Sequence, residues 1–433
     1  MSKGWLTNLV LLAVVAAGAG GLWWAERQTK ADKQREEAAR DFTGFKVTDL
    51  VKARLTRSGQ EPIVLEKGAD GWRITAPTAC LTDSDAVEGL LKVVEGRYDR
   101  KVAETTPNLA DFGLDKPGAI LEVTTGASQT ATLITGSDTP ASINRYLRLG
   151  PEGPVVTAPR YELSLLERGR NDLRAKALGA ALDRKAEVVR MEVIKGGNRL
   201  AVAMDDQGFW RLEAPLADLA SPRRVRYWIG DLKDSLASGF KDASPPADPD
   251  WRVILTPRGG SPLELPVWWQ DKDLLARRPG DPDALVLDAM TVNRLDKNPL
   301  EMVALDPLPP GLQVAGLKIE RDGAAVQTVK TASPARPEDQ IDAETQSARD
   351  WPNPAWATVA EVLTREAASA ELARARGLPD LVVAVTGKAA GDQGAAPAPL
   401  AYALWKDGDS YLLAPPGRPV HLRLTRFQTD SLD

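Results

Sequence analysis

The chain has 433 residues, of which 43% are apolar and 27% charged, a balance that is ordinary for a globular protein of roughly two to four domains. Its formal net charge of −5 gives no basis for nucleic-acid binding, which needs a concentrated basic face. The single cysteine, Cys80, excludes an internal disulfide and a thiolate metal cluster, and the single histidine, His421, removes most histidine-based metal and acid–base sites.

The N-terminal segment predicts a transmembrane anchor at residues 1–25. Residues 4–25 carry no charge and would span about 33 Å as a helix, enough for a bilayer core. Trp5 and the pair Trp23-Trp24 lie at its ends, where interfacial aromatic side chains belong. A cleaved signal peptide with Ala17-Gly18-Ala19 as its cleavage site is the alternative. The apolar run continues to the tryptophan pair, which favours the uncleaved anchor.

The residues around this segment support two opposite membrane topologies. Only Lys3 precedes it, whereas five basic residues follow within residues 26–44, and plain positive-inside counting would keep the body in the cytoplasm. A very short N-terminal tail before an apolar run is instead typical of a signal-anchor, and we favour this topology, with the body outside. Residues 26–44 predict a charged helical stalk, because Glu26/Lys30 and Lys33/Glu37 are opposite charges four residues apart.

Residues 45–184 predict a first α+β unit. Alternating apolar residues and a glycine-bearing turn predict a three-stranded antiparallel meander that ends in the motif Trp72–Pro77. Ser84 is the predicted N-cap of an amphipathic helix that runs to about Tyr98. Further strands follow, and a helix from about Arg160 closes the unit.

The same pattern recurs 138 residues further along the chain. The motif Trp72-Arg73-Ile74-Thr75-Ala76-Pro77 returns as Trp210-Arg211-Leu212-Glu213-Ala214-Pro215. The apolar helix stripe Val87, Leu90, Leu91, Val94 and Tyr98 returns as Val225, Trp228, Ile229, Leu232 and Leu236. Because motif and stripe keep one offset, residues 185–310 are predicted to be a second repeat.

Residues 311–433 predict a third, degraded repeat. Val314–Glu320 and Ala325–Val329 resemble its opening hairpin, and Leu381–Val385 and Tyr402–Trp405 its later strands. The predicted helix stripe is Trp356, Val359, Ala360, Leu363 and Ala367. The expected fold class is therefore α+β: an N-terminal transmembrane helix followed by two or three tandem repeats of an antiparallel β-meander plus an amphipathic helix.

Several motifs of the first unit resemble the bacterial family DUF4340. They are Trp72–Pro77 with the helix after it, Phe112-Gly113-Leu114-Asp115-x-Pro117, Tyr146-Leu147-Arg148 and Asn171-Asp172-Leu173-Arg174, with Phe112 where the family often has tyrosine. The resemblance covers about residues 45–182 well and the second unit more weakly. It implies a membrane-anchored envelope protein, often encoded beside the permease and auxiliary components of gliding-motility-type ABC transporters. It implies no catalytic residues.

The reactive residue types do not assemble into a motif. Cys80 has no nearby histidine in sequence, and His421 lies in an alternating strand, so a structural role is favoured for both. The pairs Asp83/Asp85, Asp271/Asp273 and Asp281/Asp283 lack the further oxygen ligands and glycine turn of a calcium loop. We therefore predict no catalytic residue, metal ligand or cofactor.

Two groups of residues are predicted contacts for a ligand or partner. Trp268 and Trp269 are neighbours in a strand and should point to opposite faces, one into the core and one outward. Arg223, Arg224 and Arg226 surround the start of the second helix, where cations oppose the helix dipole. An anionic partner would explain this placement, although a solvated helix face is the simpler interpretation.

The predicted function is a non-enzymatic, membrane-anchored auxiliary or substrate-handling subunit of an ABC-type transport system. The body would lie in the periplasm, attached by a single pass to the bacterial inner membrane, with a permease or another auxiliary membrane protein as partner. One alternative is a module that binds cell-wall glycan or polysaccharide, which an exposed tryptophan in a groove would favour. The other is a carboxylate-dependent envelope hydrolase, which needs two facing carboxylates in one cleft.

Overall fold

The computed structural model describes most of the chain beyond residue 38. The described residues are 39–69, 71–103, 108–183, 185–309, 312–321, 323–330, 359–364, 378–389, 398–408 and 410–424, together with Trp23, Arg27 and Ala368. The predicted anchor, apart from Trp23, and most of the predicted stalk lie outside these residues. None of the helices formed by the described residues combines the length and the apolar character that a membrane crossing needs.

The chain divides into two compact units. Unit 1 comprises Met1–Lys176 and Gly280–Pro282, and unit 2 comprises Ala177–Pro279 and Asp283–Asp433. Antiparallel sheets with few and short helices make up the described parts of both units, so the fold is a β-rich form of the predicted α+β class.

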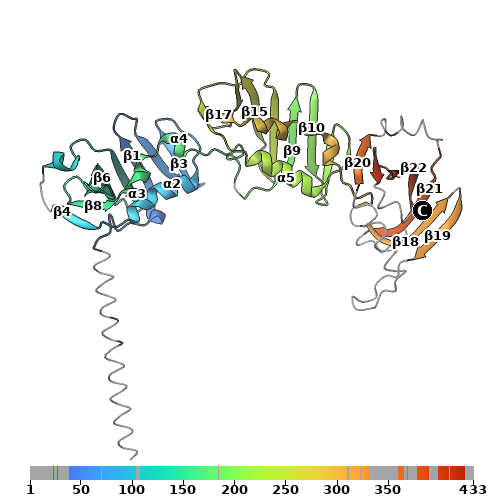
Figure 1. The fold of residues 1–433 in the computed structure, drawn as a ribbon, viewed down its shortest axis with the longest axis horizontal. Coiled ribbons are helices and arrows are strands. Elements are labelled where there is room, and N and C mark those ends of the chain that lie inside the picture. Colours follow the sequence, from blue (N-terminus) through green and yellow to red (C-terminus); the bar gives the residue numbers. More distant parts are fainter. Residues whose placement is uncertain are drawn as a thin grey trace, which may run out of the picture. The chain divides into compact units, whose positions relative to one another are not determined.

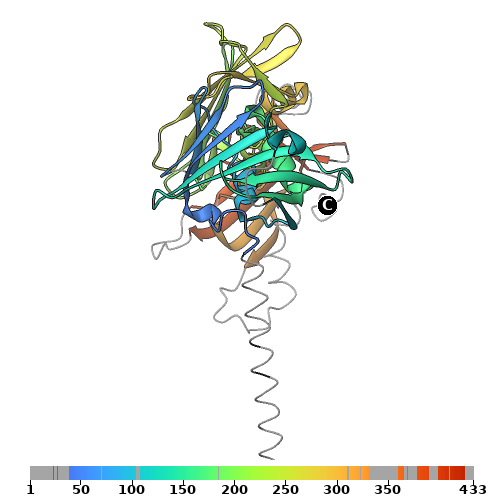
Figure 2. The ribbon, with the colours of Figure 1, turned by 90° about the vertical axis from the view of Figure 1, so that its left-hand side faces the viewer.

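Unit 1 is built on one antiparallel sheet of eight strands in the order β3-β2-β1-β5-β6-β7-β8-β4. Its strands are coloured blue to blue-green in Figure 1 and Figure 2. The strands are β1 (Leu50–Arg57), β2 (Ile63–Gly68), β3 (Gly71–Ala76), β4 (Arg100–Ala103), β5 (Ala119–Thr125), β6 (Thr130–Asp138), β7 (Asn144–Leu149) and β8 (Val155–Pro159). The helices are α2 (Ser84–Leu91), α3 (Arg160–Leu163) and α4 (Arg170–Leu173), with 3-10 turns η1 (Val47–Asp49), η2 (Lys92–Glu95), η3 (Leu109–Phe112) and η4 (Ser164–Glu167).

The helix α2 differs from its sequence prediction at both ends. Its N-cap is Asp83 rather than Ser84, because the Asp83 carboxylate accepts the backbone N–H groups of Asp85 and Ala86. The helix does not reach Tyr98. The chain straightens at Gly96, where a Cβ atom would lie 2.5 Å from the Phe42 ring. Tertiary pairing with the segment before the sheet therefore ends the helix early, since Phe42 N–H donates to the Gly96 carbonyl.

This pairing also corrects the end of the predicted stalk. Asp41 forms a bridge with Arg97, and the Phe42 side chain is buried in the core of unit 1. Burial of the Phe42 ring lowers the free energy of the chain, whereas a solvated stalk would leave the ring in water. The last residues of the predicted stalk, from about residue 39, therefore belong to the folded unit.

Unit 2 begins with a nine-stranded antiparallel sheet in the order β12-β11-β10-β9-β14-β15-β16-β17-β13. The strands are β9 (Val188–Lys195), β10 (Asn198–Met204), β11 (Trp210–Ala214), β12 (Asp218–Leu219), β13 (Gly239–Lys241), β14 (Trp251–Pro257), β15 (Leu263–Gln270), β16 (Asp273–Ala276) and β17 (Ala284–Leu287). The helices are α5 (Pro222–Lys233) and α6 (Val292–Leu295), with 3-10 turns η5 (Ala289–Thr291) and η6 (Pro299–Met302). Figure 1 shows α5 against one face of this sheet.

A second sheet of unit 2 has the order β19-β18-β21-β22-β23-β24-β20. Its strands are β18 (Leu312–Arg321), β19 (Ala324–Lys330), β20 (Val359–Thr364), β21 (Leu381–Ala389), β22 (Leu400–Asp407), β23 (Ser410–Ala414) and β24 (Val420–Leu424). The helix predicted from the stripe Val359, Ala360 and Leu363 is wrong, because these residues form β20. They pair with β24, with Leu363 opposite His421. The backbone hydrogen bonds of this pairing outweigh the helical spacing of the apolar residues, and the β-branched Val359 favours a strand. Trp356 and Ala367, the ends of that stripe, lie outside the described residues.

The three sheets share one strand order. When the strands of unit 1 are numbered along the chain, their order in the sheet is 3-2-1-5-6-7-8-4. The first sheet of unit 2 has the same order when its edge strand β12 is left out of the numbering. The second sheet of unit 2 repeats this order without a counterpart of β3 among its described residues. Trp72 in β3 and Trp210 in β11 are both buried, and each of these strands is followed by a cis Ala-Pro bond.

The two sheets of unit 2 share a hydrophobic core and a buried ion pair. Arg418, in the turn between β23 and β24, donates through Nε to Asp218 Oδ1 at 2.8 Å and through Nη2 to Asp218 Oδ2 at 3.1 Å. Its guanidinium also donates to the carbonyls of Ala304 and Asp306. The pair therefore links β12 to the turn that carries Arg418, with good hydrogen-bond geometry.

Candidate functional site

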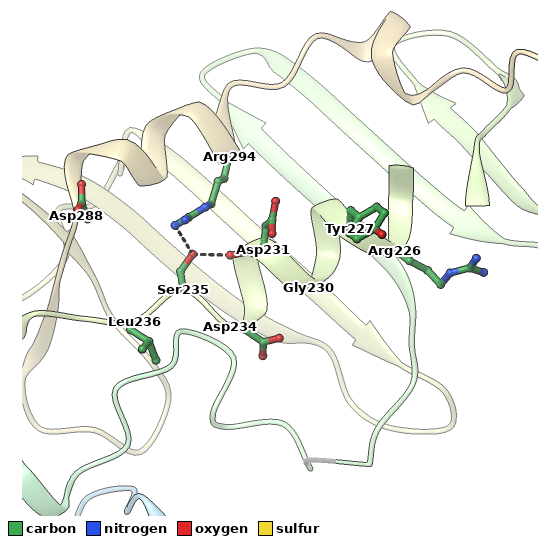
Figure 3. Close-up of a pocket in the computed structure, with 9 residues that line it drawn as sticks. All are labelled: Arg226, Tyr227, Gly230, Asp231, Asp234, Ser235, Leu236, Asp288 and Arg294. Carbon is green, nitrogen blue, oxygen red and sulfur yellow. Dashed lines mark hydrogen bonds between the residues drawn. The ribbon is translucent and has the colours of Figure 1, made fainter. Parts of the chain in front are cut away.

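A hollow of about 540 Å³ lies beside the C-terminal half of α5 in unit 2 (Figure 3). Its lining residues come from α5, from the segment that follows α5, from the N-cap of η5 and from α6. They are Arg226, Tyr227, Gly230, Asp231, Asp234, Ser235, Leu236, Asp288 and Arg294. The volume is in the range of sites that bind small molecules or a few side chains of a partner.

The sequence of α5 explains why these residues face outward. Ser221 caps the helix and Pro222 occupies its first turn, where the missing N–H is not needed. Val225, Trp228, Ile229 and Leu232 then face the sheet and are buried, as the sequence stripe predicts. The remaining positions of the last two turns, including Tyr227, Gly230 and Asp231, are left on the outer face.

Gly230 forms the depression in that outer face. A Cβ atom at this position would meet no heavy atom within 4 Å, so no close packing requires a glycine here. Its backbone is helical, and an alanine would stabilise the helix by about 0.5–1 kcal/mol. The glycine thus leaves space on the helix surface at a cost in stability that packing does not explain.

The wall of the hollow is held by hydrogen bonds between α5 and α6. Trp228 Nε1 donates to the Arg294 carbonyl at 2.7 Å, and Arg294 Nη1 donates to Ser235 Oγ at 3.0 Å. Ser235 Oγ in turn donates to the Asp231 carbonyl at 2.6 Å (Figure 3). This network fixes the end of α5 against α6, so the hollow is preformed.

Three carboxylates and two guanidinium groups line the hollow. Asp231, Asp234 and Asp288 all line the hollow, and the C-terminal end of α5 adds a partial negative charge. Of the two lining arginines, Arg294 is already engaged with Ser235, and Figure 3 shows Arg226 extending away from the other labelled side chains. The arrangement favours a cationic group.

Large apolar side chains stand at the rim. Tyr227 is 63% exposed and Leu236 is 67% exposed, and Met290, next to the capping residue Asp288, is 62% exposed. The sequence predicts Leu236 as the last residue of the buried stripe, and this is wrong. The helix ends at Lys233 and the chain pairs with Ala177 through Leu236, so this side chain turns to solvent.

Residues 72–249 match the model of a family described as "Domain of unknown function (DUF4340)". This part of the chain belongs to the DUF4340 family. The match confirms the resemblance seen in the sequence motifs, and it includes α5 and the lining residues up to Leu236, whereas Asp288 and Arg294 lie beyond it. No curated protein and no solved structure matches the chain.

The tryptophan pair Trp268-Trp269 lies outside this match and is not part of the lining of the hollow. Trp268 is buried against Leu275, Ala243 and Ala284, whereas Trp269 is 41% exposed, which confirms that neighbouring strand residues face opposite sides. The Trp269 N–H donates to Asp250 Oδ2 at 2.8 Å. A ligand contact at Trp269 stays a prediction, and Trp268 serves the core.

The three arginines at the start of α5 have different surroundings. The guanidinium of Arg223 lies 5.6 Å from the centroid of the Tyr227 ring, and Arg224 Nη1 donates to the Glu301 carbonyl at 2.9 Å. Only Arg226 lines the hollow. A role for the three residues in binding an anionic partner stays a prediction.

The paired aspartates have structural partners. Asp83 caps α2, and Lys241 Nζ lies 2.9 Å from Asp273 and 3.8 Å from Asp271, a hydrogen bond and charge attraction that raise the pKa of Lys241. Within unit 1, Asp281 Oδ1 lies 3.5 Å from Arg174 and accepts the Leu81 N–H. Among the described residues no three acidic, cysteine or histidine side chains are grouped to hold a metal ion.

Cys80 and His421 are both buried. Cys80 donates its backbone N–H to the Ile74 carbonyl, and His421 lies in β24 with its ring centroid 6.0 Å from that of Trp405. Sequence reasoning missed the hollow itself. Its available signal was Gly230, a helix-interior glycine at an outward position that is followed by acidic residues.

Proposed function

We propose that the chain is a non-enzymatic, membrane-anchored binding or scaffold subunit that serves an ABC-type transport system. Residues 1–25 would anchor it by a single pass in the bacterial inner membrane, with the body in the periplasm. The observation that carries the proposal is the recurrence of one strand order in three sheets. Arrays of similar modules usually present binding surfaces to partners.

We infer that the three sheets are tandem repeats of one unit. The last strand of each sheet pairs with an earlier strand at the sheet edge: β8 with β4, β17 with β13, and β24 with β20. The chain reaches β4 and β13 by way of the segments that carry α2 in unit 1 and α5 in unit 2. The buried tryptophans Trp72 and Trp210 at one sequence offset support the same interpretation. The partner implied by the family resemblance is a permease or another auxiliary membrane protein of the transporter.

Complementation of a null strain tests the proposal. Deletion of residues 1–25 should abolish function, because a tethered subunit relies on the high local concentration of its partner. The intact chain should co-purify with a permease in mild detergent, whereas the Cys80→Ala, His421→Ala double variant should still complement. If the double variant is inactive while an exported soluble body complements, the accessory role is refuted and an enzymatic role takes its place.

A glycan-binding function is the second candidate, and the exposure of Trp269 favours it. An exposed aromatic ring can stack on the apolar face of a sugar. Sedimentation with purified cell-wall polysaccharide tests this function, with Trp269→Ala as the variant and Tyr161→Ala, another exposed aromatic residue, as the matched control. Equal sedimentation of both variants and the parent would exclude Trp269 as a sugar contact.

A further inference from the structure

We propose that the hollow beside α5 binds a segment of a partner protein in which a lysine or arginine stands next to a large apolar side chain. The proposal rests on the binding role proposed above and names the chemistry of the partner. It is independent of membrane attachment and of transport. Shape, charge and apolar exposure support it separately.

The shape argument comes from Gly230. Glycines in helices are often explained by a neighbour that approaches too closely for a side chain, but here the space above the helix is open. The equivalent position of unit 1, 138 residues earlier, is Lys92, an exposed residue at the start of η2. Of these two positions, only that of Gly230 carries no side chain and leaves room for one from a partner.

The charge argument comes from the groups around this space. The carboxylates of Asp231 and Asp234 project from the last turns of α5, and Asp288 lies on the opposite side of the hollow (Figure 3). The C-terminal end of a helix attracts cations, which adds to the field of these carboxylates. Arg226 and Arg294 also line the hollow, and Lys233 Nζ lies 3.9 Å from Asp234 Oδ1. The lining therefore keeps one more carboxylate than guanidinium groups, and Arg294 Nη1 is directed to the neutral Ser235 hydroxyl and not to a carboxylate.

The exposed apolar side chains favour a peptide over a free polyamine as the ligand. Tyr227, Leu236 and Met290 are each more than half exposed, and all three stand at the lining or beside a lining residue. Exposed apolar side chains that gather at a concave site usually mark an interaction surface. A polyamine would need the carboxylates alone, whereas a segment with basic and apolar side chains uses both features.

A solvated helix face is the simpler alternative. It accounts for the acidic residues, since charged side chains on an outer helix face are common. It accounts neither for a helix-interior glycine without a packing reason nor for two large apolar lining residues, Tyr227 and Leu236, that are mostly exposed. These two observations favour a bound partner.

Fluorescence anisotropy with the purified full chain in nanodiscs of zwitterionic lipid tests the proposal. The probe is a short fluorescent peptide that alternates pairs of lysine and leucine, and two companion probes replace lysine by glutamate or leucine by serine. Gly230→Leu should fill the hollow and weaken binding of the Lys/Leu probe about tenfold or more, as expected for a blocked central contact. Its melting temperature should stay at or above that of the parent, which separates lost binding from lost folding.

Lys92→Leu is the matched control, because it places the same side chain at the equivalent position of unit 1. It should leave the Kd of the probe unchanged. The Asp231→Asn, Asp234→Asn double variant should weaken binding and reduce its dependence on salt, since it removes charge but keeps the Asp231 carbonyl that accepts from Ser235.

Four results would overturn the proposal: no binding of the Lys/Leu probe, equal binding of the glutamate probe, equal effects of Gly230→Leu and Lys92→Leu, or competition by spermidine as strong as by unlabelled peptide. The last result would make a polyamine the occupant. Permease co-purification is measured separately, so a hollow that binds no peptide and a chain that binds no transporter are distinguishable failures.

Discussion

The buried pair of Arg418 and Asp218 is predicted to hold the two sheets of unit 2 together. The Arg418 side chain is 7% exposed and that of Asp218 is 1% exposed, so neither charge can be rehydrated without opening the fold. The perturbation is Arg418→Ala. It leaves Asp218 with only the Leu219 N–H as a described donor, and it removes the donors to the carbonyls of Ala304 and Asp306.

The expected loss follows from this geometry. Removing one partner of a buried, hydrogen-bonded ion pair costs about 3–5 kcal/mol, because the remaining charge is left without compensation. Arg418→Lys should lose less than Arg418→Ala, since it keeps the charge but not the two-pronged contact with Asp218. The double variant Arg418→Met, Asp218→Leu should be more stable than Arg418→Ala, because no unpaired charge remains buried.

Hydrogen exchange of the full chain in increasing urea, measured by mass spectrometry, reports this loss locally. Peptides from β12, β23 and β24 should exchange at lower urea in Arg418→Ala, and peptides from unit 1 serve as the internal control. Arg258→Ala, which removes an exposed pair with Glu187, should leave the exchange of all peptides nearly unchanged. If Arg418→Ala changes exchange no more than Arg258→Ala does, the pair does not hold the two sheets together.

Three further outcomes are expected. Trp210→Ala should lower the free energy of unfolding of unit 2 by about 3–5 kcal/mol in urea titrations, because Trp210 is buried in its core; an unchanged midpoint would contradict that packing. Gly230→Ala should raise the free energy of unfolding by about 0.5–1 kcal/mol, and a loss in thermal melts would contradict the open space above the helix. Burial raises the pKa of Tyr402, which donates to the Pro307 carbonyl. Because its folded-state pKa lies above the unfolded value, its contribution is present below about pH 10 and lost as the pH rises further. Tyr402→Phe should therefore unfold less steeply with alkaline pH than the parent, and identical pH profiles would refute this.

Features that depend on local spacing were predictable from the sequence. The alternation of a strand predicts that one of Trp268 and Trp269 is buried and the other exposed, and the structure buries Trp268. The 3.6-residue period of α5 buries Val225, Trp228, Ile229 and Leu232. The motif shared by β3 and β11 likewise marks Trp72 and Trp210 as core residues. Each of these outcomes needs only the backbone geometry of one element and the preference of apolar side chains for burial.

The sequence by itself therefore determined which faces of its elements are buried. Where pairing between distant segments competes with local spacing, only the tertiary structure decided. Val359–Thr364 satisfies a helical apolar pattern but forms β20, because β24 supplies a strand partner from residues 420–424. Leu236 fits the stripe of α5 but is exposed, because the chain leaves the helix to pair with Ala177. The hollow depends on folding most of all, since Gly230 and Arg294 approach each other only when α6 packs on α5 through the hydrogen bond of Trp228.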